Sequence, residues 1–539
     1  MKTNRIFLGI SMGLLMVLGS CSKMLDIPQN GSFSQEDFYQ TDEDALAAVA
    51  TIYNHWRSSY ETRMTLLTTL SDEASKGGAN INFFATWKER NSYIFNAGNE
   101  GIATYYKAAY EMVYYCNLII ENVAPDTPVK KQCVAEAKFF RAYTYFHLAA
   151  LFGETVPVVD HLLSTEEYHV GRSEPGQLWT LVENDLKASL ESLPSKASKT
   201  DKNTYRVTKE AAEVMLGKAY LWQKKYAEAA SEFDKVVNSG LYGLWGVDEP
   251  GEYKMLLHAA ANDCCEKVLD IRIPKDADNY DKNNLSNTTK WWGYFFWSSR
   301  MSKMTTAASN TYSTGEGYLP PRKELYDAFV AEEGVDGYRL NSTLKTVWQL
   351  ADEGITVTAD MPDHDLYFNW KNRGLKEDLM AVMSGRGSEH MTYTNMPVIR
   401  YAEVLLLAAE AQLLGGSPAK ADQYVNQVRQ RAKLGAKTGV TLQDIQTEKN
   451  LELCFEGVRY LDIIRWGIAY DLMKDQGKET YNLKVTKDGP NYTYERVVSD
   501  TNPNAGFKQG KNELLPIPKA EMDVNGVENG GKMTQNPGW

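Results

Sequence analysis

Gly217 lies between large residues at helical spacing, and this pattern is the strongest indication of the fold in the sequence. From Leu216 and Gly217 onward, small and large residues alternate over two helical stretches. The later members of the pattern are Tyr220, Tyr226, Ala229, Phe233 and Val236. In this pattern the two helices of a tetratricopeptide pair interlock, so the sequence predicts a helical pair here.

Two further helical pairs are predicted at other places in the chain. Residues 401–414 carry a stripe of apolar side chains, and residues 418–431 follow after a Gly-Gly turn. A less regular pair combines residues 135–152 with residues 177–193. Since these pairs are widely separated rather than tandem, we expect one helical core interrupted by long insertions.

The largest of these insertions spans residues 240–395. It is rich in Gly, Asn and Ser and contains short strand-like pieces such as residues 266–273. We expect the helical parts, residues 35–239 and 396–539, to pack with it into one compact unit. The predicted fold class is therefore mainly α, with a tetratricopeptide-like scaffold and a large irregular insertion.

The N-terminus has the features of a bacterial lipoprotein signal. Lys2 and Arg5 precede an apolar run, residues 6–18, that is too short for a transmembrane helix. Small residues then lead directly to Cys21. We predict a signal peptide over residues 1–20, acylation of Cys21, and a lipidated tether over residues 21–34.

The first helix and the loop behind it can be placed from local signals. Thr41 followed by Asp44 predicts a helix start, and the helix is expected to run to about Ser59. Residues 71–99 are predicted to form a long loop with several Asn and aromatic residues. Loops of this length and composition are usually either functional or disordered.

Composition and motifs exclude several functions. A net charge of −12 without a basic run argues against a nucleic-acid partner. The sequence contains no motif of a metalloprotease, a serine hydrolase or a dinucleotide-binding enzyme. We therefore predict a protein that is not an enzyme and needs no cofactor.

Two acidic segments were considered as metal sites. Asp276, Asp278 and Asp281 lack the glycine and the bidentate glutamate of a calcium loop. Asp363, His364 and Asp365 are adjacent, and adjacent loop residues rarely converge on one ion, so we expect them at the surface. No metal site is predicted, although a structural Ca²⁺ is compatible with the acidic loop.

An aromatic run, residues 291–297, lies inside the insertion. Such residues fit a buried strand, but they also fit a platform for a ligand. We expect Trp291, Tyr294 and Trp297 to face outward and Phe295 and Phe296 to belong to the core.

Several stretches together resemble the SusD/RagB family of outer-membrane nutrient-binding lipoproteins. They are the lipobox at Cys21 and residues 36–39, 135–143, 397–406, 426–429, 455–462, 465–467, 514–518 and 535–539. The resemblance implies a helical fold of four tetratricopeptide-like pairs. It also implies a lipid-anchored protein at the outer membrane, facing the cell exterior, that acts as a lid on a SusC-like TonB-dependent transporter.

The resemblance further implies capture of oligosaccharides or polysaccharides by aromatic and polar side chains of the variable loops. A sugar ring stacks its C–H face on an aromatic ring while Asp, Asn and Arg bind its hydroxyls. The candidate ligand contacts are Asp72, Asn80, Trp87, Trp291, Trp292, Tyr294, Trp297 and Arg373.

Other functions stay open from the sequence. Some relatives capture oligopeptides by the same lid mechanism. A glycoside hydrolase using two of the many carboxylates is a less favoured alternative. A scaffold that recruits only proteins would leave the aromatic run buried.

Overall fold

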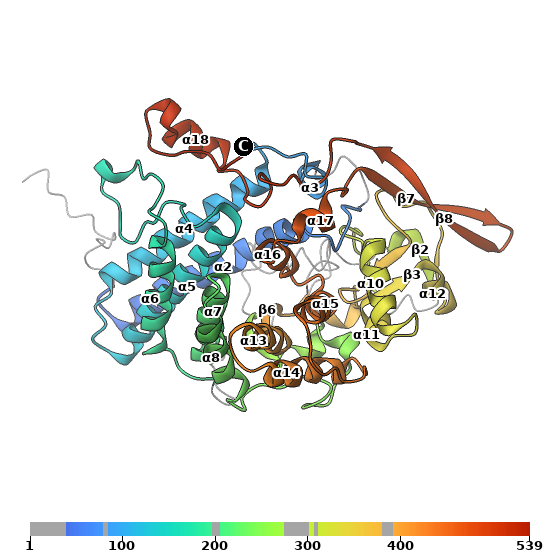
Figure 1. Cartoon of the computed structure of the whole chain (residues 1–539), viewed down its shortest axis with the longest axis horizontal. Helices are drawn as coiled ribbons and strands as arrows, with labels where there is room; N and C mark the ends of the chain where they lie inside the picture. Colours follow the sequence, from blue (N-terminus) through green and yellow to red (C-terminus); the bar gives the residue numbers. More distant parts are fainter. Residues whose placement is uncertain (1–38, 79–84, 197–204, 274–300, 307–310, 380–391) are drawn as a thin grey trace, which may run out of the picture.

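The computed structural model describes residues 39–78, 85–196, 205–273, 301–306, 311–379 and 392–539. Within these ranges the chain is mostly helical with a few short strands, which confirms the predicted fold class. Helices of the first half lie at one side of the molecule, and the segment 301–378 lies at the other (Figure 1). None of the helices in the described ranges combines the length and the apolar character needed to cross a membrane.

Helix α2 (Asp42–Leu70) begins at the predicted residue and ends later than predicted. Thr41 and Asp44 form a reciprocal capping box, in which the Asp44 N–H donates to the Thr41 hydroxyl at 3.1 Å. Every residue from position 63 to position 70 is buried. Because these last turns are buried on all sides, their sequence does not alternate between a polar and an apolar face. The predicted end near Ser59 is therefore too early.

The predicted helical pairs form. They are α5 (Pro128–Phe152) with α6 (Gln177–Leu190), α7 (Lys209–Trp222) with α8 (Tyr226–Val237), and α13 (Tyr401–Gly415) with α14 (Pro418–Arg431). At Gly217 a side-chain Cβ would lie 2.6 Å from the ring of Phe233. The small residue on α7 therefore admits the large one on α8, as the interlocking pattern predicts.

Helix α4 (Glu100–Asn122) packs between α2 and α5 and completes the N-terminal helical layer. After α14 the chain continues through α15 (Leu442–Leu453), α16 (Arg459–Arg465) and α17 (Ala469–Met473). Near the C-terminus, α18 (Lys519–Asn525) lies beside the N-terminal helices in Figure 1. The C-terminal part of the described chain thus packs with its N-terminal helices.

The predicted insertion enters and leaves through one antiparallel pair of strands. Strand β1 (Lys267–Ile271), close to the predicted piece at 266–273, pairs with β6 (Met396–Arg400). Between them, β2 (Met304–Thr306) pairs with β4 (Ile355–Val357), and β3 (Leu344–Thr346) pairs with β5 (Tyr367–Asn369). Helices α11 (Tyr338–Thr343) and α12 (Val347–Asp352) pack on these short ladders, and α10 (Lys323–Glu333) packs on α11.

A long hairpin, β7 (Glu479–Asp488) and β8 (Asn491–Thr501), extends over this second region (Figure 1). Leu483 on β7 is fully buried in a small separate core with Phe368 and Trp370. Val485 and Tyr494 of the hairpin are partly buried against the same core, so apolar side chains on its inner face anchor the hairpin on the insertion, while most of its other residues are exposed.

A buried ionic network joins the insertion to the C-terminal helices. The guanidinium of Arg400 binds Glu266 and Glu456, with Nε 2.6 Å from a Glu456 carboxylate oxygen, and it also reaches Glu452. Arg339, from the insertion, binds Glu448 at 2.7 Å and Glu452 at 3.3 Å. Because these charges are fully desolvated, removal of one partner would leave another buried and uncompensated.

The five cysteines in the described ranges are free thiols. Cys116 and Cys133 are buried within α4 and α5, and Cys454 is buried directly after the end of α15. Each packs there as a small apolar residue.

Candidate functional site

Two hollows border the short helix α3 (Ala85–Asn91), which lies inside the predicted binding loop. We call the first the charged cleft; its volume, including the space open to solvent, is about 480 Å³. Its principal lining residues are Ser75, Lys76, Lys88, Asn91, Arg322, Glu324, Asp363, Asp365, Glu479, Tyr481 and Arg496. The cleft is thus built from three distant parts of the chain: the N-terminal loop, the insertion and the hairpin.

Backbone pairing fixes the N-terminal wall of the charged cleft. The Ser75 N–H donates to the carbonyl of Pro320 at 2.9 Å, and the Gly78 N–H donates to Gly317 at 3.0 Å. Gly78 has a φ of +97°, and a Cβ there would overlap the ring of Tyr318. This wall therefore requires glycine where two loops cross.

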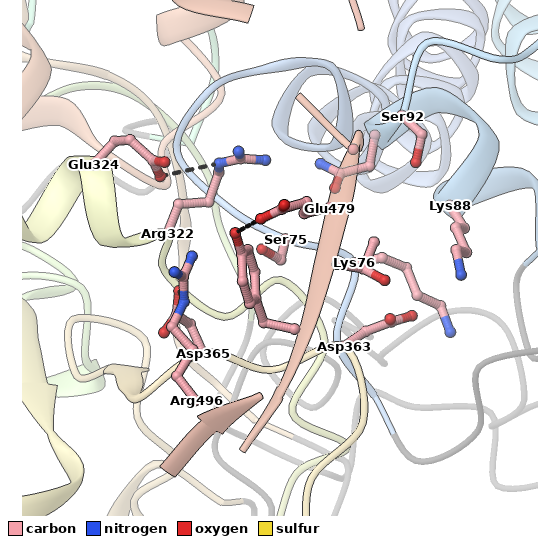
Figure 2. A pocket seen from close by; sticks show the side chains of 14 residues that line it. Ser75, Lys76, Lys88, Ser92, Arg322, Glu324, Asp363, Asp365, Glu479 and Arg496 are labelled. Carbon is pink, nitrogen blue, oxygen red and sulfur yellow. Dashed lines mark hydrogen bonds and ion pairs between the residues drawn. The ribbon is translucent and has the colours of Figure 1, made fainter. Parts of the chain in front are cut away.

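A stacked pair forms the hairpin wall. The Arg496 guanidinium lies 3.3 Å from the ring centroid of Tyr481 and donates from Nε to Asp365 at 2.8 Å. The Tyr481 hydroxyl donates to Glu479, and this hydrogen bond raises the pKa of Tyr481. Figure 2 shows Asp365 and Arg496 close together at one side of the cleft. The mutual contacts in this wall hold both the aromatic ring and the charges in place.

The opposite side of the cleft carries two lysines and a carboxylate. Lys88 pairs with Asp500 at 3.5 Å, and the Lys76 ammonium lies 5.5 Å from the centroid of the Tyr318 ring. Burial lowers the pKa of Lys76 to about 8, against the opposing effect of the Asp363 carboxylate. Burial likewise raises the pKa of Asp363, while Lys88 and Lys76 counteract this rise.

The backbone of Asp363 is held in the left-handed conformation, with a φ of +48°. Its N–H donates to the Asn482 side chain at 3.0 Å, which ties it to the hairpin. Its Oδ2 is buried and has no hydrogen-bond partner among the described residues. An unsatisfied buried acceptor is costly, so this oxygen is suited to receive a donor from outside the chain.

We call the second hollow the threonine groove; its volume, including open space, is about 820 Å³. It lies between α2, α3 and α4, and its lining includes Ser58, Thr62, Thr65, Thr86, Thr104, Glu61 and Trp87. Trp87 is 9% exposed and packs edge-on against Tyr318, with ring centroids 5.5 Å apart. The groove therefore combines hydroxyl groups with one edge of an indole.

Arg90 supports the floor of the threonine groove. It is 1% exposed and donates from Nε to Thr69 and from Nη1 to Asn99, both at 3.0 Å. A Cβ at Gly101 would lie 2.2 Å from Nη1 of Arg90, so the close approach of α4 requires a glycine. The shape of the groove is consequently fixed by the buried hydrogen bonds of Arg90 and by the close packing of α4.

The structure brings one of the predicted ligand contacts, Trp87, to a hollow. Asp72 forms an ion pair with Arg459, and Arg373 donates to the carbonyls of Lys254 and Trp370 at 2.7 and 3.1 Å. Neither side chain lines the two hollows, and both have partners within the protein. Ligand binding by these residues stays a prediction.

The other predicted positions lie outside the described residues. They are Asn80, Trp291, Trp292, Tyr294, Trp297, the core candidates Phe295 and Phe296, the acidic loop at 276–281 and the lipidation residue Cys21.

The prediction that Asp363, His364 and Asp365 lie at the surface is wrong. All three are buried, with exposed fractions of 7%, 5% and 5%. Asp365 is neutralised by Arg496, from a hairpin far along the chain, which the local sequence cannot indicate. No group of three metal-ligating side chains occurs among the residues that the structure describes.

Sequence comparison matches both halves of the chain to related family models. Residues 373–539 match the model described as the SusD family, and residues 35–221 match one described as "starch-binding associating with outer membrane". The chain belongs to the SusD family.

Individual relatives agree with this membership. The chain is 24% identical to SusD-like protein P2 of Formosa agariphila, over 98% of both chains. It is also 24% identical to a SusD-like protein of Bacteroides ovatus, covering 84% of this chain and 80% of that protein.

Solved structures have the same fold. A laminarin-binding SusD-like protein superposes with a TM-score of 0.75 at 25% identity, covering 93% of this chain and all of the other. Surface glycan-binding protein A of Bacteroides thetaiotaomicron, in complex with laminarihexaose, has a TM-score of 0.72 at 21% identity, covering 92% of this chain and all of the other.

Proposed function

We propose that this SusD-family protein captures oligosaccharides or polysaccharides at the outer membrane and delivers them to a SusC-like TonB-dependent transporter. In this proposal Cys21 carries the lipid anchor, the protein faces the cell exterior, and it performs no chemistry on the glycan. The named glycan ligands of its structural neighbours support the choice of ligand class.

The observation that carries the proposal is the occurrence of the charged cleft and the threonine groove on the two sides of α3. A sugar presents hydroxyls that both donate and accept hydrogen bonds, together with C–H faces that pack on aromatic rings. The cleft supplies charged donors and acceptors, and the groove supplies hydroxyls and the edge of Trp87. Asn80 and the aromatic residues at 291, 292, 294 and 297 are proposed as further glycan contacts.

The direct test is calorimetric titration of the mature chain with laminarihexaose and other neutral hexaoses, which we expect to bind in the micromolar range. Thr62→Arg would fill the threonine groove with a long side chain from α2, and we expect affinity at least tenfold weaker. Thr51→Arg places the same side chain at an exposed position of the same helix and should leave binding unchanged. Equal affinity in both variants would contradict a role for the groove.

Three further measurements separate the alternatives. Retention of peptides from a peptide library, with no binding to any glycan, would favour oligopeptide capture. Release of shorter products from a bound glycan would identify a hydrolase. Unchanged affinity after Trp291→Ala and Trp297→Ala would exclude the aromatic run as a platform.

A further inference from the structure

Asp363 differs from the other acidic side chains of the charged cleft. Asp365 binds Arg496 at 2.8 Å, Glu479 accepts from the Tyr481 hydroxyl, and Glu324 pairs with Arg322 at 3.5 Å. The Oδ2 of Asp363, in contrast, is buried without a hydrogen-bond partner in the described part of the chain. Within the part of the chain that the structure describes, the cleft therefore holds a desolvated acceptor that no neighbouring residue satisfies.

The charges around Asp363 restrict the kind of ligand group that could donate a hydrogen bond to its Oδ2. The ammonium groups of Lys76 and Lys88 interact electrostatically with its carboxylate, and Figure 2 shows all three on the same side of the cleft. A metal ion or an amino sugar at Asp363 would be repelled by the two lysines. A carboxylate or sulfate group would be attracted by the two lysines, but it is repelled by Asp363 and has no hydrogen to donate to the unsatisfied Oδ2. An uncharged hydroxyl meets neither penalty.

We propose that Asp363 is a specificity-determining residue that accepts a hydrogen bond from a hydroxyl of an uncharged sugar unit in the charged cleft. A lysine ammonium of the same wall donates to a neighbouring oxygen of that unit. This inference rests on the proposed function, and it adds that neutral glycans are preferred over acidic and cationic ones. The Asp363 carboxylate and the lysine ammonium would thus bind two adjacent oxygens of one sugar unit at the same time.

The backbone at this position supports a functional role for the side chain. Non-glycine residues with a positive φ are uncommon, and Asp and Asn tolerate this conformation best. The Asp363 N–H is fixed by Asn482, so the backbone directs the carboxylate independently of any ligand. Asparagine at this position retains the shape and the backbone preference while removing the charge.

The test uses Asp363→Asn in the mature chain, with Asp360→Asn as the matched control. Asp360 lies three positions away and pairs at the exposed surface with Lys484, outside the cleft. Titrations would use laminarihexaose and other neutral hexaoses, an oligogalacturonate and a chitosan oligosaccharide. We expect Asp363→Asn to weaken neutral binding about tenfold or more and Asp360→Asn to leave it unchanged. Wild-type protein should bind the charged oligosaccharides at least tenfold more weakly.

A melting experiment separates a ligand contact from a structural role. Without ligand, Asp363→Asn should melt at the same temperature as wild type or higher, because a buried charge has been removed. A lower melting temperature together with weaker binding would overturn the inference.

Other outcomes bear on the two proposals separately. Equal affinity of wild type and Asp363→Asn for a neutral hexaose, or preference for a charged oligosaccharide, overturns the inference and leaves glycan capture intact. Failure of the wild-type protein to bind any of these glycans overturns both.

Discussion

Asp72 and Arg459, separated by 387 positions in the chain, form a two-pronged ion pair. The Arg459 Nε donates to Oδ1 of Asp72 at 2.8 Å, and Nη2 donates to Oδ2 at 2.7 Å. Although burial would raise it, the Arg459 guanidinium holds the pKa of Asp72 below its ordinary value. The pair connects the end of α2 to the start of α16, and so joins the two helical halves of the fold.

Replacing Asp72 by Ala should destabilise the protein by about 2–4 kcal/mol, because Arg459 would keep its burial and lose its counter-charge. Urea denaturation measures this change. Lys187→Ala, which removes an ion pair between an exposed lysine and Glu183 on helix α6, should cost less than about 1 kcal/mol. If Asp72→Ala lowered the free energy of unfolding no more than Lys187→Ala does, the Asp72–Arg459 pair would contribute no more than a surface ion pair.

Glu73, next in the chain, should make stability depend on pH. It is buried, and burial together with the neighbouring Asp72 raises its pKa from 4.5 to about 7. Between these values the folded protein holds a proton that the unfolded chain releases. The stabilisation is thus complete below about pH 4.5 and is lost as the pH rises to about 7.

Glu73→Gln should remove this dependence. The difference in free energy of unfolding between wild type and variant should change by about 1–3 kcal/mol between pH 5 and pH 8, in favour of the variant at pH 8. Glu528→Gln, at an exposed carboxyl, serves as the control. Parallel pH profiles for wild type and Glu73→Gln would contradict the assignment.

Gly217→Ala should destabilise the α7–α8 pair. The new Cβ would lie 2.6 Å from the Phe233 ring, and the resulting overpacking should exceed the gain in helix propensity by about 1–2 kcal/mol. Gly435→Ala introduces the same group where no atom lies within 4 Å. Chemical denaturation of both variants should show a loss of stability at position 217 only.

The helical scaffold was predictable because its signals are local. The Thr41 and Asp44 side chains meet within one helical turn, and Gly217 meets Phe233 within one helical pair. Because the residues of each contact are close in sequence, their spacing alone predicts the helix start and the helical pair. The hairpin was missed, although Asp488-Gly489 between two β-rich runs is a turn signal that was available. The end of α2 was placed too early because its last turns are buried on all sides.

The candidate site was only partly predictable. The segment 71–99, predicted as a long loop, contains the short helix α3, and Lys76, Trp87 and Lys88 from it line the two hollows. Ligand binding by this segment stays a prediction. Asp363 and Arg496 could not be grouped with this segment, because only tertiary folding brings residues from the insertion and the hairpin to it. Local polarity suggested a solvated surface at Asp363, whereas its burial depends on those distant partners.

Because the charged cleft is built from three distant parts of the chain, it can form only at a late stage of folding. Its walls come from residues near 75–92, 322–365 and 477–496, so closing it requires contacts across nearly the whole chain. Contacts of such long range form late, after the local helical pairs. A chain in which the hairpin has not docked lacks one wall of the charged cleft, whereas the threonine groove, built from α2, α3 and α4, needs no hairpin residue. The complete cleft is therefore present only in molecules that have finished assembling the fold.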